Sequence, residues 1–157
     1  MKIKLICVGK TVNSYLKEGE AEYLKRLKHY SPVEKIEIPE LKNAKKLSKD
    51  QIKTQEGQLI LNQIKPGETI ILLDERGKHH SSMEFSKYLQ KKFNSGGKGI
   101  AFIIGGAYGF SDEIYSKATD KISLSKMTFS HQMVRLFFLE QIYRGFTLLK
   151  GEPYHHE

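Results

Sequence analysis

The sequence predicts an α/β fold in which a mostly parallel sheet carries helices on both faces. Apolar runs of strand length alternate with amphipathic helical patterns along the chain, which is typical of βα repetition. The 157 residues, 39% of them hydrophobic, suit one domain, and no internal repeat, low-complexity tract or linker interrupts them. We therefore expect a single domain over residues 1–157, with its strands buried on both faces.

The first forty residues predict a strand, a helix and a second strand. An apolar run makes Lys2–Val8 the first strand, and Val33–Ile38 has the length and composition of the next. Between them, the spacing of apolar residues predicts a helix near Tyr15–His29. Its inward face comprises Leu16, Tyr23, Leu24 and Leu27.

The middle of the chain repeats this alternation with clear helix signals. Ser48 and Gln51 have the spacing of a capping box, so a helix is expected to begin there and to end before Pro66-Gly67. A strand is expected at Thr69–Leu73. Ser81, with Glu84 three residues later, predicts the start of the next helix.

The last third contains two strands that each run into a loop suited to receiving a ligand. Ile100–Ile104 breaks at Gly105-Gly106, and Ser111 is expected to cap a short helix near Asp112–Ala118. Ile122–Leu124 is followed by residues 125–129, after which Ser130 is expected to cap a long final helix near Ser130–Lys150. Because the carboxyl ends of parallel strands meet at one edge of a sheet, both loops should face one crevice.

Several classes of site are poorly supported. The first strand ends in Val8-Gly9-Lys10 without a GxGxxG fingerprint, and GGAYGF lacks the Lys-Ser/Thr of a P-loop. Cys7 is the one cysteine, and no metal-binding Cys/His pattern accompanies it, so we expect a small buried side chain and no metal. The first fourteen residues are too short an apolar run for a membrane span and lack a cleavage site, so a cytoplasmic protein without membrane attachment is expected.

The charge distribution favours a polyanionic partner without establishing one. The formal net charge is +8, and residues 1–65 contain 14 Lys and Arg against 8 Asp and Glu. Five lysines follow one another through a loop and into the helix that begins at Ser48: Lys42, Lys45, Lys46, Lys49 and Lys53. Phosphate contacts and an ordinary solvated lysine face are equally compatible with this pattern.

Taken together, segments from the whole chain resemble the SPOUT class of methyltransferases and, within it, the RlmH family of ribosomal large-subunit pseudouridine N3-methyltransferases. The resemblance rests on MKIKLICVGK, TIILLDERGKHHSS, IIGGAYGF, ISLSKMTFSHQMVR, EQIYRGF and GEPYHHE. It implies a deep trefoil knot in the carboxyl-terminal part, an exception to the rule against threaded chains. Composition and periodicity alone predict an unknotted sheet.

The resemblance also implies that S-adenosylmethionine binds in the knot, at the ends of three strands. The matching positions are Leu73, Gly105, Leu124, Ser125, Lys126, Met127, Thr128 and Phe129. Apolar walls with a few backbone hydrogen bonds suit a purine and a sulfonium better than a phosphate cradle would. Core packing is the alternative role for Leu73, Leu124 and Met127.

The implied acceptor is N3 of a pseudouridine in a stem-loop of 23S rRNA, within the assembled ribosome. Removing its imide proton requires a nearby base or cation. The candidates are His131, Arg135, Tyr143, Arg144, Tyr154 and His155. His131 and Arg135 are four residues apart, so we expect both to point to one place. His131 could instead only cap its helix, and Arg144 could only pair with Glu140. Many family members carry Arg or Lys where this chain has His156.

The resemblance further implies a homodimer. The final helix carries more apolar residues than one side of a small sheet needs, and part of that surface is expected to cover a partner: Met133, Val134, Phe137, Phe138, Ile142 and Phe146. The alternative function is a non-catalytic, ribosome-associated RNA-binding protein that uses the basic amino-terminal part.

Overall fold

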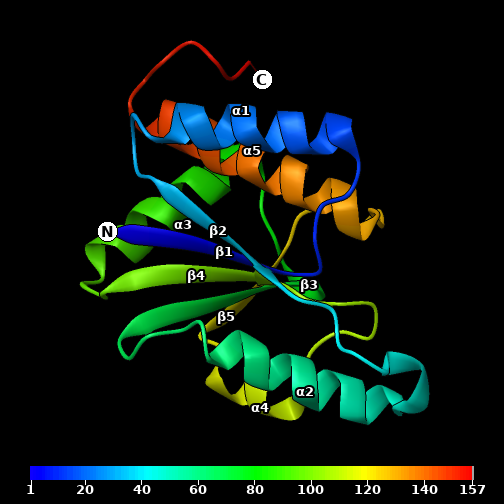
Figure 1. The fold of residues 1–157 in the computed structure, drawn as a ribbon. Helices are drawn as coiled ribbons and strands as arrows, with labels where there is room; N and C mark the ends of the chain where they lie inside the picture. Colours follow the sequence, from blue (N-terminus) through cyan, green and yellow to red (C-terminus); the bar gives the residue numbers. More distant parts are fainter. Residues whose placement is uncertain (157) are drawn as a thin grey trace.

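The structure, a computed structural model, describes residues 1–156 and contains one five-stranded sheet with strand order β2-β1-β4-β3-β5. All four strand pairings are parallel, which confirms the predicted parallel α/β architecture (Figure 1). The strands are β1 (Lys2–Val8), β2 (Val33–Ile38), β3 (Glu68–His79), β4 (Gly99–Ile104) and β5 (Asp120–Ser123).

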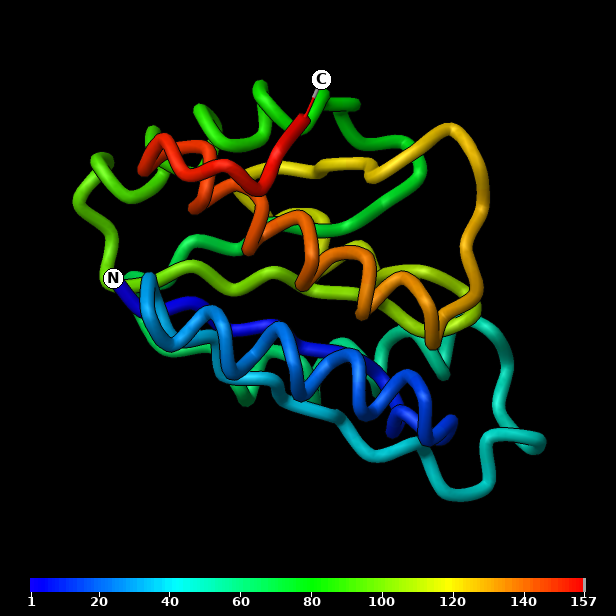
Figure 2. The backbone as a smooth tube through the Cα atoms, turned by 90° about the horizontal axis from the view of Figure 1, so that it is seen from above, coloured from blue at the N-terminus to red at the C-terminus, as the bar shows by residue number. Residues whose placement is uncertain are grey.

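Helices cover both faces of this sheet. Figure 1 shows α1, α3 and α5 on one face and α2 and α4 on the other, and Figure 2 shows α1 and α5 side by side from above. The helices are α1 (Ser14–Leu27), the 3-10 helix η1 (Ala44–Lys46), α2 (Lys49–Leu61), α3 (Ser82–Asn94), α4 (Asp112–Lys117) and α5 (His131–Leu149).

Alternation along the central strands divides the apolar residues into two cores. On β1, Ile3, Leu5 and Cys7 belong to the larger core beneath α1, α3 and α5, whereas Ile6 belongs to the smaller core beneath α2 and α4. Burial raises the pKa of Cys7 to about 12, so its thiol stays protonated and inert. The expectation of a small buried side chain at Cys7 is confirmed.

Local signals in the sequence predict the helix starts well. Ser48 and Gln51 form the predicted capping box, and the side chains of Ser81, Ser111 and Ser130 cap α3, α4 and α5. The main difference lies in β3, which does not stop at Leu73 as predicted but continues to His79 after an irregularity between Leu73 and Lys78. Leu124, predicted as a strand residue, lies just beyond the end of β5.

Strand β3 crosses the end of β5 at very close range. β3 pairs with β5 before the irregularity, at Ile71–Leu73, and again after it, at Lys78 and His79. A Cβ atom on Gly77 would lie 2.5 Å from the carbonyl carbon of Ile122, so the two backbones touch where only glycine fits. The segment between the two pairings is thereby directed outward, toward the carboxyl-terminal edge of the sheet.

A buried ion pair joins the amino ends of β1 and β3. Lys4 Nζ lies 2.9 Å from Glu68 Oε1, both side chains are 6% exposed, and Lys4 also donates to the carbonyl of Gln63. Burial alone would raise the pKa of Glu68, but hydrogen bonds from Lys4 Nζ and from the Lys65 backbone N–H outweigh it and hold the pKa below its usual range.

This pair predicts a specific dependence of stability on pH. Because the folded state lowers the pKa of Glu68, its contribution is present above the unfolded pKa of about 4.3 and is lost as pH falls through the folded value. Glu68→Gln should reduce the free energy of unfolding by about 2 kcal/mol at pH 7. Urea denaturation should show this difference shrinking at pH 3, and an equal difference at both pH values would contradict the assignment. Glu18→Gln, at an exposed position of α1, is the control.

Candidate functional site

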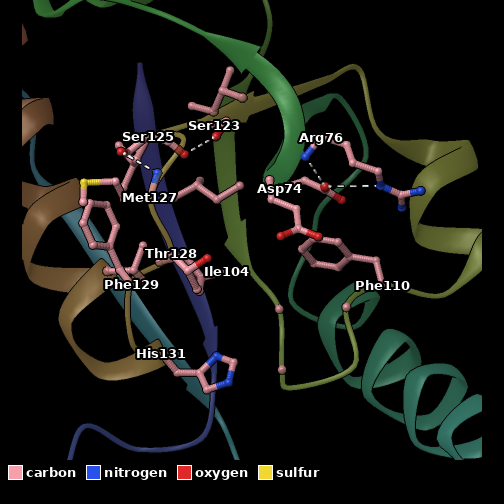
Figure 3. A pocket seen from close by; sticks show the side chains of 18 of the residues that line it. Asp74, Arg76, Ile104, Phe110, Ser123, Ser125, Met127, Thr128, Phe129 and His131 are labelled. Atoms are coloured by element: carbon pink, nitrogen blue, oxygen red, sulfur yellow. Dashed lines mark hydrogen bonds and ion pairs between the residues drawn. The ribbon is translucent and has the colours of Figure 1, made fainter.

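A cavity of about 960 Å³ opens at the carboxyl ends of β3, β4 and β5. It is lined by residues that follow each of these strands, so the prediction that two loops face one crevice is confirmed and a third segment joins them. In Figure 3, Ser125, Met127, Phe129 and His131 lie on one side and Asp74, Arg76 and Phe110 on the other. All eight residues predicted to hold the cofactor line this cavity, as does His131.

The glycine loop after β4 packs tightly against its own aromatic residue. A Cβ atom on Gly105 would lie 2.9 Å from the ring of Phe110, which is buried in the smaller core. Gly109 adopts a left-handed φ of 81° and bridges back to Gly106. Gly105 is therefore needed for the packing of the loop as well as for close approach of a ligand.

The opposite wall is an irregular segment after β5. Ser125 Oγ accepts a hydrogen bond from the Met127 backbone N–H at 3.0 Å, and the Ser125 carbonyl accepts one from Ser123 Oγ at 3.1 Å. Met127 is 77% exposed, and the ring of Phe129 packs on that of Phe137 at 5.1 Å. The wall thus combines apolar side chains with peptide groups outside any helix or strand.

Sequence analysis did not identify three polar residues that line the cavity opposite residues 125–129: Asp74, Arg76 and Tyr115. Asp74 accepts hydrogen bonds from the Tyr115 hydroxyl and the Arg76 backbone N–H, and Arg76 Nη2 donates to the same hydroxyl at 2.9 Å. Burial would raise the pKa of Asp74, but these contacts lower it, so the carboxylate is ionised at neutral pH. The charged residues that directly follow the apolar run of β3 could have identified Asp74 and Arg76. Tyr115 could not be identified in this way, because only the tertiary structure places α4 beside β3.

His131 and Arg135 do not point to one place. His131 is exposed at the rim of the cavity. Arg135 is 1% exposed and turns to the end of β1, where its guanidinium donates to the carbonyls of Val8 at 2.7 Å and Gly9 at 2.9 Å. The expectation was wrong because the end of β1 presents backbone carbonyls that accept hydrogen bonds from the buried guanidinium.

The remaining candidates form a separate group at the other end of α5, which we call the tail cluster: Tyr143, Arg144, Tyr154 and His155. The ring of Tyr154 packs edge-on against Tyr143 at 4.8 Å, and Arg144 Nη1 lies 3.0 Å from His155 Nδ1. Arg144 also pairs with Glu140, as the alternative interpretation of this residue expected. Arg144 follows His131 by thirteen positions along α5, roughly 20 Å along the helix axis. Within one chain, the tail cluster is therefore remote from the cavity.

The part of the chain that the structure describes gives no support for a metal site or for a membrane-spanning helix. Within residues 1–156, no cluster of three or more His, Cys, Asp and Glu side chains is arranged to hold a metal ion. None of the helices in the same range has the length and apolar character needed to cross a membrane.

Comparison with known proteins identifies the family to which this chain belongs. Residues 1–155 match the model of a family described as "Predicted SPOUT methyltransferase". The chain belongs to the SPOUT methyltransferase family. The resemblance found in the sequence is confirmed, and the chain is an enzyme that uses S-adenosylmethionine, the methyl donor of SPOUT methyltransferases.

Curated relatives of this SPOUT chain match it over its full length. Those from Parabacteroides distasonis and Flavobacterium psychrophilum are 55% and 58% identical over 157 residues, covering 100% of both chains. A third, from Cytophaga hutchinsonii, is 56% identical over 156 residues, which is 99% of this chain and 100% of the relative. Each is named ribosomal RNA large subunit methyltransferase H.

The position of Arg135 predicts a structural effect rather than a catalytic one. Arg135→Met should lower the free energy of unfolding by about 3 kcal/mol, because it leaves buried carbonyls without their donor. His131→Ala, at the exposed start of the same helix, should change it by less than about 0.5 kcal/mol. Urea denaturation of both variants measures the contrast, and an Arg135→Met protein as stable as wild type would show that the guanidinium is dispensable for folding.

Proposed function

We propose that this SPOUT enzyme transfers the methyl group of S-adenosylmethionine to N3 of a pseudouridine in a stem-loop of 23S rRNA, acting on the assembled ribosome. The observation that carries the proposal is the large cavity at the ends of three parallel strands, with apolar and peptide walls. The names of the relatives, which specify ribosomal RNA of the large subunit, support the substrate class. A cytoplasmic location follows from that substrate.

The cavity lining fits the cofactor. Leu73 of β3 and Leu124 after β5 offer apolar contacts, and Gly105 has no side chain that would fill the space for the ligand. Residues 125–129 provide peptide groups and the exposed thioether of Met127. When bound, S-adenosylmethionine supplies an already activated methyl group. These residues then have to orient the donor and exclude water, which is the positioning that in-line transfer requires.

We further propose that the chain forms one domain whose carboxyl-terminal part is threaded as a trefoil knot. The support is the contact of Gly77 with the backbone of Ile122, where β3 pairs with β5 on both sides of an outward excursion. The segment that contacts Gly77 at Ile122 leaves β5 and continues into α5, which is the local geometry that threading needs.

A homodimer is proposed from the apolar surface that continues from the cavity along α5. Phe138, Ile142 and Phe146 of the predicted set are buried within the subunit. Met133 and Phe137, one turn apart, are more than one third exposed and adjoin the exposed Phe129. A second subunit placed on this band would remove large apolar side chains from water.

The dimer would also bring the tail cluster to the cavity. If two α5 helices pair antiparallel about a two-fold axis, the carboxyl end of one lies beside the amino end of the other. The roughly 20 Å between Arg144 and His131 within one chain is then no obstacle, because the tail cluster beside each cavity comes from the other subunit. Each active site would combine the cavity of one subunit with the tail cluster of its partner.

The structure suggests distinct roles within the tail cluster. Burial, together with hydrogen bonds to Tyr23 and Glu140, raises the pKa of Tyr154, so its hydroxyl remains protonated and can donate but not act as a base. Arg144 holds the ring of His155 and provides a permanent positive charge beside it. Because Arg144 can only donate, it occupies the Nδ1 lone pair of His155, whose neutral ring then presents Nε2–H as a donor. We assign stabilisation of the imide anion to Arg144 and His155, with the imide proton passing to water, packing and orientation to Tyr143 and Tyr154, and a contact at the rim to His131.

A non-catalytic RNA-binding protein is not favoured, because such a module has no need of a cavity of this size with apolar and peptide walls. Calorimetry tests the cofactor site directly. S-adenosylmethionine should bind equally well with and without EDTA. Leu124→Arg should weaken binding at least ten-fold by placing a charge in the cavity, whereas His155→Ala should leave the affinity unchanged. Absence of binding to the wild-type protein would refute the assignment.

Subunit complementation tests the composite active site. Leu124→Arg removes the cavity and His155→Ala the tail cluster, so each homodimer should transfer methyl groups to ribosomes at least about 10²-fold more slowly than wild type. Refolding the two variants together at equal concentration should restore about a quarter of the wild-type rate, since half of the dimers are mixed and each has one intact site. Mixed dimers without recovered activity would place the site within one chain.

A further inference from the structure

We propose that four lysines of the β2–α2 connection form an RNA-backbone-binding surface that leads to the methyl-transfer cavity. These residues, called the lysine surface below, are Lys42, Lys45, Lys46 and Lys49. The inference rests on the proposed function and extends it by naming where the RNA is held outside the reaction centre.

The lysine surface carries charge that the protein does not neutralise. All four side chains are exposed, and in the part of the chain that the structure describes none of their ammonium groups lies within ion-pair distance of a carboxylate. Asp50, the acidic residue in the first turn of α2, pairs instead with Lys53 at 3.4 Å. Four uncompensated positive charges within eight residues provide a strong local attraction for a polyanion.

Defined local structure holds these lysines. Asn43 adopts a left-handed φ of 62° and starts η1, and the capping box of Ser48 and Gln51 starts α2 two residues after η1 ends. The side chains of Leu41, just before Lys42, and of Leu47, between Lys46 and Lys49, are half-buried. The charges are therefore displayed on a turn of fixed backbone, which lowers the entropy cost of engaging a ligand.

The lysine surface continues directly into the cavity through an aromatic side chain. Lys49 Nζ lies 5.4 Å from the centre of the Tyr108 ring, and Tyr108, 47% exposed, lines the cavity. Figures 1 and 2 place the β2–α2 connection and the loop after β4 at the same end of the sheet. Gln58 of α2 donates to Glu113 of α4 at 2.9 Å, which ties α2 to the element that follows the glycine loop.

This combination fits RNA better than a membrane. Lysine ammonium groups contact phosphates without reading sequence, and an exposed aromatic ring can stack on an unpaired base. A membrane-binding surface would need exposed apolar residues among the lysines, whereas Leu41 and Leu47 are only partly exposed. The order of groups, from lysines to Tyr108 to cavity, matches a nucleotide entering the site while its flanking backbone stays outside.

The test replaces all four lysines by glutamine and compares the variant with a matched control. The control carries the same charge change at four exposed lysines toward the other end of the sheet or on α3: Lys65, Lys87, Lys91 and Lys98. Both proteins are first checked for unchanged stability and unchanged affinity for S-adenosylmethionine. Binding to purified large ribosomal subunits is then measured between about 50 and 200 mM KCl, a range over which phosphate-dependent binding changes steeply. Methyl transfer to the same particles is followed at varied particle concentration.

The lysine-surface variant should bind the particles at least ten-fold more weakly near 0.1 M KCl. Its slope of log affinity against log salt should fall by about 1 for each phosphate that is no longer neutralised. The KM for particles should rise while kcat changes little, and the control should resemble wild type. If both variants bound the particles equally weakly, the effect would come from net charge and not from these positions. If binding were unchanged, the four lysines would be ordinary solvated side chains. Either result overturns the inference. Failure of the wild-type protein to methylate the particles would instead overturn the proposed function.

Discussion

The contact of Gly77 with the backbone of Ile122 is the constraint on which the site depends. It lets β3 pair with β5, shift its register through an irregular segment between Leu73 and Lys78, and pair with β5 again. The excursion carries Asp74 and Arg76 to one side of the cavity, while the chain leaving β5 supplies Leu124 to Phe129 on the other side (Figure 3). A side chain at position 77 would separate the two backbones and, with them, the two walls.

Helix α5 organises the rest of the functional surface, because its first, middle and last turns contact different parts of the molecule. Its first turns are tied to the β1–α1 loop by Arg135 and by Gln132, whose side chain bonds Val12 N–H and the Lys10 carbonyl. Its middle buries Phe138 and Ile142 in the larger core, while Phe137 and, in the first turn, Met133 remain exposed. Its last turns hold the tail cluster. One helix therefore separates the cavity proposed to hold the cofactor from the tail cluster proposed to meet the acceptor, and the proposed second subunit would bring the two together.

The charge pattern follows a similar division. The charges within the cores are paired and structural: Lys4 pairs with Glu68, Glu20 pairs with Lys35, and Arg135 and Lys35 both lie beside the more exposed Glu37. The exposed lysines of the lysine surface collect beside the cavity mouth, where the chain leaves β2 and enters α2. Charges that stabilise the fold and charges available to a polyanion thus occupy different places, and the net charge alone does not distinguish them.

The sequence by itself determined features that depend on near neighbours in the chain. The apolar runs of β1 and β4 predicted their strands, serine caps predicted the starts of α2, α3, α4 and α5, and the loops after β4 and β5 predicted the crevice. Only the tertiary structure decided the strand order, the extension of β3 to His79, and the separation of Arg135 from His131. It also placed Tyr115 on Asp74 and the tail cluster far from the cavity of its own chain. These outcomes depend on which groups meet across the fold: a guanidinium turns to whichever carbonyls a distant strand presents, and a strand continues wherever a neighbour offers hydrogen bonds.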